Sequence, residues 1–136
     1  MTLDTLRARD LMTNKIVRGL PEETLREAAV RMDEHNIHGL LVDPPVRGRG
    51  YCILTMKDCI EVICDAGEEA LDALCVEDAM TRPAVTIPAD LLVSDCIRLM
   101  RHAGVRMAPV LEGVDVIGVL TFTDVLRACA HRHPTG

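Results

Sequence analysis

Two stretches of the sequence place a Thr and an Asp three residues apart, directly after an apolar run. The first stretch, 51–60, contains Thr55 and Asp58, and the second, 116–126, contains Thr121 and Asp124. Each predicts a buried strand that turns into a helix, where backbone N–H groups lack partners and the helix dipole is positive. Such a corner suits a phosphate or a ribose. The recurrence of the arrangement indicates a duplicated binding corner.

The same pairs also fit a purely structural role. A Thr at the N-cap with an acidic residue three positions later is a capping arrangement that contributes about 1 kcal/mol to helix stability. In the second stretch, Gly118 would let a ligand approach the strand backbone. The strand expected to lie opposite begins at Val105-Arg106 and offers a guanidinium for a phosphate. His38, before the apolar run 39–42, occupies the matching place in the first half of the chain. Both interpretations, binding corner and helix cap, therefore remain open.

Further matches show that the whole chain is a tandem repeat. Asp10-Leu11-Met12-Thr13 recurs 68 residues later as Asp78-Ala79-Met80-Thr81, and Met32 recurs at the same shift as Met100. The Thr–Asp pairs are 66 residues apart, and the loop 43–50 accounts for the difference. Matches in one order at a near-constant shift indicate internal duplication. The predicted organisation is repeat 1 over residues 8–66, a linker over 67–75, repeat 2 over 76–130 and a tail over 131–136.

Hydrophobic periodicity and capping signals give the same elements in both copies. In repeat 1 we expect a helical turn at 9–12, an extended piece at 16–17, a helix from Thr24 to about Asn36, strands at 39–42 and 51–54, and a helix from Thr55 to about Asp65. In repeat 2 we expect strands at 84–87, 105–110 and 116–120, and helices at 91–102 and 125–131. Each unit is thus β-α-β-β-α, an α/β (α+β) fold. Units of this size bury little surface alone, so we expect two pseudo-symmetric repeats packed through their sheets.

Composition excludes several classes of function. The 136 residues carry a formal charge of −6 and include one Tyr, one Phe and no Trp. A nucleic-acid binder would need basic patches or stacking rings. No apolar run is long enough for a membrane span, and no signal peptide is evident. The six cysteines form no CxxC pair, so we interpret them as buried thiols of a cytoplasmic protein and expect no metal site.

These motifs resemble a known family. Both copies are similar to the CBS domain, and the pair resembles a tandem CBS module, also called a Bateman module. The resemblance covers residues 8 to about 130. It is carried by Asp10–Thr13, Asp78–Thr81, Gly104–Val110 and Gly118–Asp124.

The resemblance implies a non-enzymatic regulatory module that senses an adenosyl ligand in the cleft between the repeats and passes the signal to a partner. The ligand would be AMP, ADP, ATP or S-adenosylmethionine, with no cofactor required. It also implies a homodimer and, as a further partner, a separate effector protein. An alternative is a dimerisation or interaction scaffold whose nucleotide sites are vestigial. An enzyme is a third class, but no P-loop and no GxGxxG are present. A thiol or metal sensor is the fourth.

When the roles of the family's binding residues are assigned to the matching positions of this chain, two sites result. Asp124 would hold the ribose hydroxyls, Thr121 would bind phosphate, and residues 83–85 would line the base. The preferred site, site 2, comprises Pro83, Ala84, Val85, Arg106, Met107, Ala108, Pro109, Gly118, Thr121, Thr123 and Asp124. The weaker site, site 1, comprises Asn14, Lys15, Ile16, His38, Gly39, Leu40, Thr55 and Asp58.

Repeat 1 departs from the family pattern at two positions. Cys52 stands where repeat 2 has Gly118, and Leu41 stands where repeat 2 has Pro109. A side chain in place of Gly118 could fill the space of a sugar or base, so we predict that site 2 binds ligand better than site 1. The loop Arg47-Gly48-Arg49 is a candidate for contacting a triphosphate.

Overall fold

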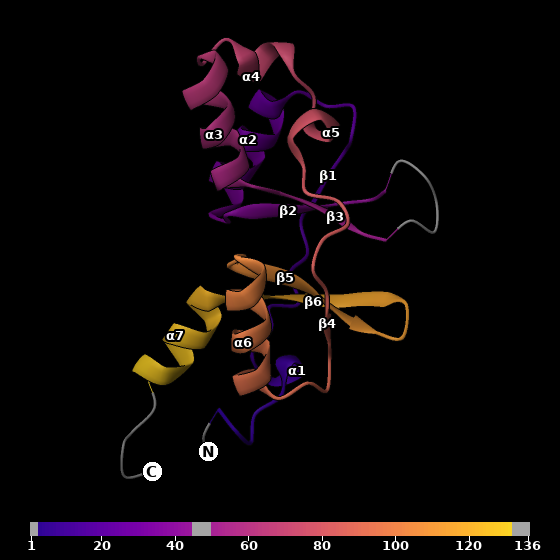
Figure 1. Ribbon diagram of the computed structural model, residues 1–136, viewed down its shortest axis with the longest axis vertical. Helices are drawn as coiled ribbons and strands as arrows, with labels where there is room; N and C mark the ends of the chain where they lie inside the picture. Colours follow the sequence, from indigo (N-terminus) through magenta and orange to yellow (C-terminus); the bar gives the residue numbers. More distant parts are fainter. Residues whose placement is uncertain (1–2, 45–49, 132–136) are drawn as a thin grey trace. The chain divides into compact units, whose positions relative to one another are not determined.

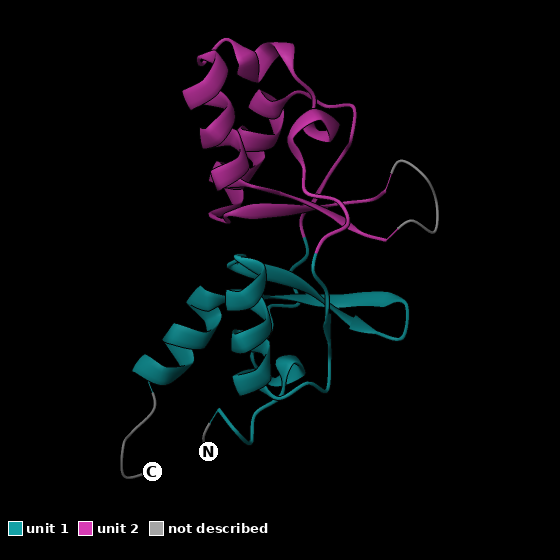
Figure 2. Cartoon of the chain, viewed as in Figure 1, with its two compact units in different colours: residues 1–16, 85–136 teal, residues 17–84 magenta. Residues whose placement is uncertain are grey.

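The chain forms two compact units in the computed structural model, which describes residues 3–44 and 50–131. Unit 1 consists of Met1–Ile16 and Val85–Gly136, and unit 2 of Val17–Ala84 (Figure 2). The opening segment of the chain therefore packs with repeat 2. The loop Arg47–Arg49 and the end of the tail lie outside the described residues.

Unit 2 holds a three-stranded sheet and its covering helices. Its elements are β1 (Arg18–Gly19), α2 (Leu25–His35), β2 (Gly39–Val42), β3 (Cys52–Thr55), α3 (Met56–Ala66), α4 (Ala70–Ala73) and α5 (Val76–Ala79). The strand order is β1-β2-β3, with β1 parallel and β3 antiparallel to β2. Both long helices, α2 and α3, cover the same face of the sheet (Figure 1).

Unit 1 repeats this arrangement. Its elements are α1 (Ala8–Leu11), β4 (Ile87–Pro88), α6 (Val93–Ala103), β5 (Met107–Glu112), β6 (Asp115–Thr121) and α7 (Phe122–Ala130). The strand order is β4-β5-β6, again with one parallel and one antiparallel pair. Helices α6 and α7 cover one face of this sheet (Figure 1). The mixed α/β class predicted from the sequence is confirmed.

Matched turns end the first long helix of each unit. Helix α2 begins at Thr24, whose hydroxyl accepts a hydrogen bond from the Glu27 N–H at 3.1 Å. It ends at Asn36 in the left-handed region, with φ 52°. Helix α6 ends at Gly104 with φ 71°. Asn and Gly are the residues that adopt this conformation most readily. The backbone therefore leaves α2 and α6 in the same way and enters β2 and β5.

Each unit has a hydrophobic core of its own. Leu25, Met32, Leu40 and Leu54 are fully or almost fully buried in the unit 2 core. Val93, Met100, Ala108 and Leu120 occupy the corresponding places in the unit 1 core. In each unit these residues lie on the first long helix, on the central strand and on the last strand. The aliphatic periodicity of the sequence therefore marks two separate cores.

Equivalent backbone contacts attach the opening segments to these cores. In unit 2, the Val76 N–H donates to the Glu23 carbonyl at 2.9 Å. In unit 1, the Ala8 N–H donates to the Leu91 carbonyl at 2.9 Å, and Thr13 pairs with Val119. Residues 8–13, at the start of repeat 1, thus pack on unit 1. They take the same structural position there that residues 76–81, at the start of repeat 2, take in unit 2.

Several predicted boundaries need correction. The strand expected at 84–87 is only β4, because the Ala84 N–H donates to the Tyr51 carbonyl at 2.7 Å and so belongs to unit 2. The helix expected from Leu91 begins at Val93. The segment 67–75 contains the short helix α4 rather than only a connection. The extended piece at 16–17 precedes β1, which forms at Arg18.

Candidate functional site

The second Thr–Asp pair forms a reciprocal cap at the start of α7. Asp124 Oδ2 accepts hydrogen bonds from the Thr121 N–H at 3.0 Å and from the Thr121 hydroxyl at 2.9 Å. The Asp124 N–H donates to Thr121 Oγ1 at 3.0 Å. No described residue donates a hydrogen bond to Asp124 Oδ1, and the side chain is half-buried. One carboxylate oxygen therefore holds the cap while the other remains available.

The first pair has the same geometry at the start of α3. Asp58 Oδ2 accepts from the Thr55 N–H at 2.8 Å, and the Asp58 N–H donates to Thr55 Oγ1 at 3.2 Å. Asp58 is also half-buried. The capping role considered for both pairs is therefore observed in both units. A carboxylate has acceptor sites on two oxygens, so the cap leaves each Asp able to accept further O–H groups.

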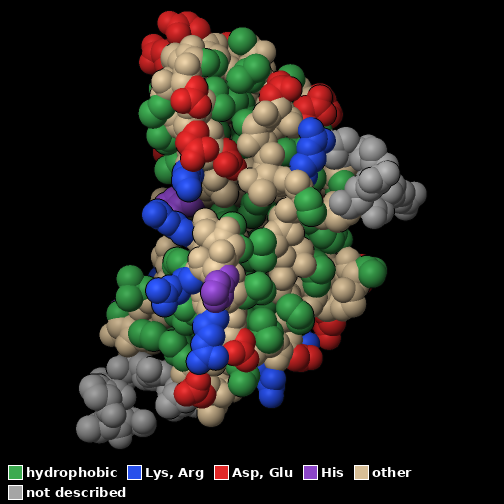
Figure 3. All heavy atoms as spheres, viewed as in Figure 1, with side chains coloured by type: hydrophobic (Ala, Val, Ile, Leu, Met, Phe, Trp, Pro, Cys, Tyr) green, Lys and Arg blue, Asp and Glu red, His purple; other side chains and the backbone are tan. Residues whose placement is uncertain are grey.

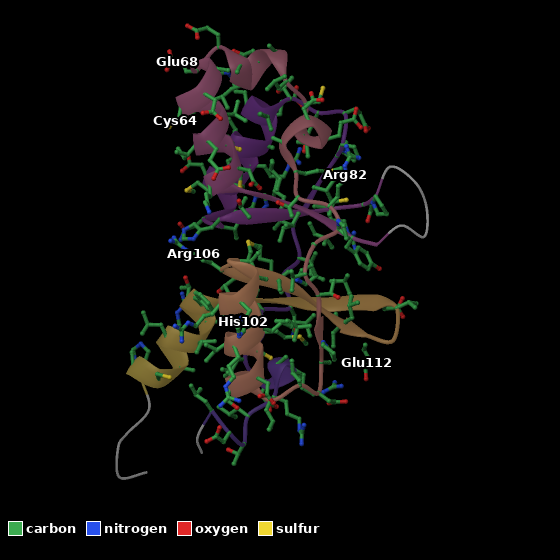
Figure 4. The ribbon with its side chains drawn as sticks, viewed as in Figure 1. Cys64, Glu68, Arg82, His102, Arg106 and Glu112 are labelled. Carbon is green, nitrogen blue, oxygen red and sulfur yellow. The ribbon has the colours of Figure 1, made fainter. Side chains whose placement is uncertain are left out.

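Arg106 and His38 occupy equivalent places beside these corners. The Arg106 carbonyl accepts from the Phe122 N–H at 3.0 Å, and the His38 carbonyl accepts from the Met56 N–H at 2.7 Å. Both side chains are exposed, and Arg106 is labelled in Figure 4. Each backbone thus ties the residue before the central strand to the first turn of the last helix. In unit 1 this places a guanidinium-bearing residue next to the N-terminus of α7.

The central strands contribute backbone rather than side chains to the corners. Met107 pairs with Thr121, and Gly39 pairs with Thr55. The side chains of Ala108 and Leu40 are 0% exposed and belong to the two cores. Pro109 is buried as well. Any ligand contact of Ala108 or Leu40 would therefore have to use main-chain atoms.

Gly118 differs from the role that the sequence suggested. A Cβ at Gly118 would lie 2.5 Å from Met12 Sδ and 2.8 Å from the Thr13 carbonyl oxygen. The missing side chain therefore makes room for the opening segment of the same unit, not for a ligand approaching on that side. Cys52, at the matching position of β3, is 1% exposed and part of the unit 2 core. The steric reason for ranking site 1 below site 2 does not hold.

Most of the remaining predicted site residues lie next to the two points where the chain passes from one unit to the other. Asn14 and Lys15 are exposed and follow Thr13, which pairs with β6. Ile16 ends the first segment of unit 1, and Val85 begins the second. Pro83 is exposed and Ala84 is buried, both in unit 2. Thr123 is exposed on α7, one residue before Asp124.

Two features of the units were missed at the sequence level. A shallow groove in unit 2 is lined by Val30 and by the Arg26–Asp72 ion pair at 2.6 Å, and none of the predicted site residues lines it. The guanidinium of Arg26 lowers the pKa of the Asp72 carboxyl. Unit 2 also buries Glu23, which receives two hydrogen bonds from Arg31 at 2.5 and 2.7 Å. Arg26 and Asp72 are 46 residues apart in the chain, and Glu23 lies eight residues before Arg31. Charged residues on a helix are usually solvated, so the sequence carried no signal for either pairing.

The described residues also limit the chemistry of the chain. Among them, no group of three His, Cys, Asp or Glu residues is placed to hold a metal ion. Burial raises the pKa of the Cys96 thiol to about 11 and also raises the pKa values of Cys52 and Cys59. These thiols therefore stay protonated near neutral pH. No helix in the described part of the chain has the length and apolar character needed to cross a bilayer.

Comparisons with known proteins agree with the duplicated architecture. The family model of the CBS domain matches residues 8–65 and 76–131. An uncharacterised protein of Methanopyrus kandleri is 28% identical over 117 residues, which are 82% of this chain and 57% of that protein. The chain therefore spans little more than half the length of this relative.

Two solved structures extend the comparison. The hexameric CBS-CP12 protein from bloom-forming cyanobacteria is 28% identical, with a TM-score of 0.83 over 90% of this chain and 70% of that one. The CBS domain pair of protein MJ0100, in complex with 5′-methylthioadenosine and S-adenosyl-L-methionine, is 20% identical, with a TM-score of 0.78 over 92% and 96%. The second likeness concerns the fold alone. With both repeats matched by the family model, the chain belongs to the CBS-domain family as a tandem pair of CBS domains.

Proposed function

We propose that this chain is a non-enzymatic regulatory module that binds an adenosyl ligand at the Thr–Asp corners and passes the signal to a partner. The observation that carries the proposal is the unused oxygen of each capping carboxylate. Asp124 Oδ2 is engaged by Thr121, whereas Oδ1 receives no hydrogen bond from the described residues. An ionised carboxylate can accept both hydroxyl donors of a ribose. Asp58 offers the same group in unit 2.

The first turn of α7 supplies a donor for a phosphate. The Phe122 N–H is bonded to the Arg106 carbonyl, and the Asp124 N–H to the Thr121 hydroxyl. The Thr123 N–H has no partner among the described residues, and it lies at the positive end of the helix dipole. Because the Thr121 hydroxyl is engaged in the cap, we assign the phosphate contact chiefly to the Thr123 N–H and to Arg106.

Charge supports the ranking of the two sites in place of the steric argument. Unit 2 contains seven Lys and Arg against fourteen Asp and Glu, a formal charge of −7. Unit 1 contains eight against seven, a formal charge of +1. A phosphorylated ligand is disfavoured by the field of an acidic unit. We therefore keep the proposal that site 2, around Asp124 and Arg106, binds an anionic ligand better than site 1.

The solved relatives support the class of ligand and the assembly. The structure of the MJ0100 domain pair contains two adenosyl compounds, and the CBS-CP12 protein is hexameric. We propose that the present chain likewise binds an adenine nucleotide or S-adenosylmethionine and acts as a cytoplasmic homodimer with an effector protein as partner. Ligand binding can shift such an assembly only if the ligand binds its two arrangements with unequal affinity.

A thermal-shift screen tests this function. AMP, ATP, S-adenosylmethionine and 5′-methylthioadenosine are added separately to the wild-type protein. A ligand that binds only the native state at a hundredfold excess over Kd adds about 2.7 kcal/mol to the free energy of unfolding, so the midpoint rises. A scaffold with vestigial sites is the second candidate, favoured by the observation that both Asp side chains act as caps. It predicts no shift with any of the four compounds.

A further inference from the structure

The opening segments of the two repeats dock on their units through the same backbone contacts. In unit 1, the Arg9 N–H donates to the Ala89 carbonyl at 3.0 Å. In unit 2, the Glu77 N–H donates to the Pro21 carbonyl at 2.9 Å. Three further pairings recur in both units: Leu6 with Val93 and Leu74 with Leu25, Arg7 with Leu92 and Cys75 with Thr24, and Thr13 with Val119 and Thr81 with Ile53. The main chain therefore holds both segments in the same way.

Apolar contacts are matched as well. In and just before the two segments, the residues that pack against the cores are Leu3, Leu6, Leu11 and Met12 in unit 1, and Leu71, Leu74, Ala79 and Met80 in unit 2. Each residue of the second set lies 68 positions after its counterpart. Ala79 is smaller than Leu11. The fully buried Val76 is larger than Ala8 and offsets this loss. A difference in how firmly the segments are held therefore has to come from polar side chains.

In unit 1, a guanidinium fastens the segment to the rest of the unit. Arg9 Nε lies 2.8 Å from Asp90 Oδ1, and Arg9 Nη2 lies 3.2 Å from Glu112 Oε1. The Arg7 guanidinium donates to the Asp90 carbonyl. Asp90 precedes α6, and Glu112 ends β5 (Figure 4). These contacts form an arginine clamp between the segment and two other parts of unit 1.

Unit 2 has carboxylates at both ends of the equivalent contact. Glu77 stands 68 residues after Arg9, and Glu22 stands 68 residues before Asp90. Both side chains are exposed, and the ion pairs within the described part of unit 2 include neither of them. On the face drawn in Figure 3, acidic side chains gather beside α5, whereas acidic and basic side chains lie together near α1. Like charges repel, so the segment of unit 2 docks without a clamp.

The segment of unit 2 leads directly into the predicted ligand site. Residues 83–85, which we expect to line the base at site 2, begin two residues after Thr81. After α5, the chain is attached to unit 2 by backbone hydrogen bonds of Thr81 and Ala84. Opening of α5 would therefore loosen a short stretch and displace the residues that line the base.

We propose that residues 76–81 are the switch segment of this module. The segment opens locally in the free protein, because Glu22 and Glu77 leave it without an arginine clamp. A ligand at site 2 needs residues 83–85 in place, so bound ligand suppresses the opening. A partner that recognises the opened segment then loses apparent affinity. The inference rests on the proposed function and names the element that passes the signal.

Hydrogen exchange of matched amides tests the switch segment. NMR gives protection factors for backbone N–H groups that donate to backbone carbonyls: Val76, Glu77, Met80 and Thr81 in unit 2, and Ala8, Arg9, Met12 and Thr13 in unit 1. Glu77→Arg supplies the missing guanidinium beside Glu22, so the protection of the unit 2 set rises about fivefold. Arg9→Glu breaks the clamp, so the protection of the unit 1 set falls about fivefold. Glu34→Arg, the same charge change at an exposed position of α2, is the matched control and alters neither set.

Addition of AMP tests the link to site 2. At ten times the Kd of AMP, opening that requires ligand release becomes about tenfold rarer, so the protection of the unit 2 set rises about tenfold. The docked segment still predominates without ligand, so loosening or tightening it leaves the AMP affinity nearly unchanged. AMP that raises the thermal midpoint without protecting residues 76–81 overturns the switch segment.

Failure of the switch segment and failure of the proposed function are distinguishable. The exchange comparison of the variants uses no ligand, so unchanged protection in Glu77→Arg overturns the switch segment whatever binds at site 2. An equal rise in Glu34→Arg also overturns it, because the effect would then follow net charge alone. Absence of a thermal shift with every adenosyl compound contradicts the proposed function instead. Far-ultraviolet circular dichroism of each variant verifies that it is folded.

Discussion

The two units share one backbone plan but fill it with different side chains. Glu23 and Arg31 form a buried ion pair in unit 2, with Glu23 only 4% exposed at its side chain. The equivalent residues of unit 1 are Leu91 and Leu99. The capping boxes at Thr55 and Thr121 are nevertheless the same. The corner geometry is thus kept while interior pairs and surface charge differ between the repeats.

The comparison shows which features the fold requires. The capping box of the last helix, the residue that ends the first long helix and the docking of residues 8–13 or 76–81 recur in both units. They recur because they satisfy backbone groups that would otherwise lack partners. The ion pair of unit 2 has no counterpart in unit 1, although Glu23 also accepts a hydrogen bond from the Leu20 N–H. Apolar residues can often replace a buried ion pair without loss of stability. Substituting a residue of one unit by its equivalent from the other therefore tests whether the fold requires it.

The largest expected effect comes from Glu23→Ala. The substitution leaves the Arg31 guanidinium without its bidentate partner and removes the acceptor of the Leu20 N–H, which donates to Glu23 Oε1 at 2.9 Å. Because Arg31 keeps partial access to water, we expect a loss of about 2–3 kcal/mol rather than the larger cost of a fully buried charge. Urea denaturation followed by circular dichroism measures it.

The matched control replaces Glu23 and Arg31 with leucine, the residue that unit 1 has at both equivalent positions. The double variant Glu23→Leu and Arg31→Leu removes both charges together, so we expect it to recover at least half of the stability lost in Glu23→Ala. A double variant no more stable than Glu23→Ala would show that the ion pair has a structural role that apolar residues cannot take.

A smaller effect is expected from exchanging Gly118 for the Cys of the other repeat. In Gly118→Cys the new Cβ would lie 2.8 Å from the Thr13 carbonyl oxygen, which is backbone and cannot move without shifting the opening segment. Overpacking of this kind costs about 1–3 kcal/mol. The urea midpoint of Gly118→Cys is compared with that of Cys52→Ser, a near-isosteric change at the equivalent position. An unchanged midpoint in Gly118→Cys would contradict the close packing of Met12 and Thr13 on β6.

The smallest effect concerns two surface ion pairs, Arg9–Asp90 of unit 1 and Arg26–Asp72 of unit 2. Hydrogen bonds from Arg9 lower the pKa of Asp90, and those from Arg26 lower the pKa of Asp72. A carboxyl whose folded pKa is depressed stabilises the protein above its unfolded pKa of about 4, and this contribution is lost as the pH falls below that value. Asp90→Asn and Asp72→Asn should therefore lower the urea midpoint slightly at pH 7.

The pH series supplies the control for this prediction. Each Asn variant is compared with the wild type between about pH 5 and about pH 2, the window in which the carboxyl becomes protonated. The difference should shrink as the pH falls. A difference that stays constant would mean that the side chain acts through packing and not through its charge.

Much of the architecture follows from local signals in the sequence. The repeats, the caps at Thr24, Thr55 and Thr121 and the central strands depend on residues that are near one another in the chain, so spacing alone predicts them. The grouping of Ala8 with Leu91 and of Thr13 with Val119 is different. These pairings join residues that are far apart in the sequence, and hydrophobic periodicity contains no information on which repeat an opening segment docks against.

The candidate site was predictable in composition but not in every role. The equivalence of Gly118 with Cys52 is confirmed by the strand registers. The equivalence of Arg106 with His38 is confirmed by the matching hydrogen bonds of their carbonyls. The function assigned to Gly118 was wrong, because a glycine that admits a ligand and one that admits a neighbouring side chain have the same sequence signature.

The central claim is that the unused oxygen of Asp124 binds the sugar of an adenosyl ligand. Calorimetric titration of AMP into the wild type, Asp124→Glu and Asp58→Glu tests it most directly, because Glu retains the charge and the capping box while moving the carboxylate. Asp78→Ala, which removes a cap at α5, controls for stability alone. We predict that Asp124→Glu weakens AMP binding at least tenfold, with smaller losses in Asp58→Glu and none in Asp78→Ala. Wild-type affinity in Asp124→Glu would contradict the account.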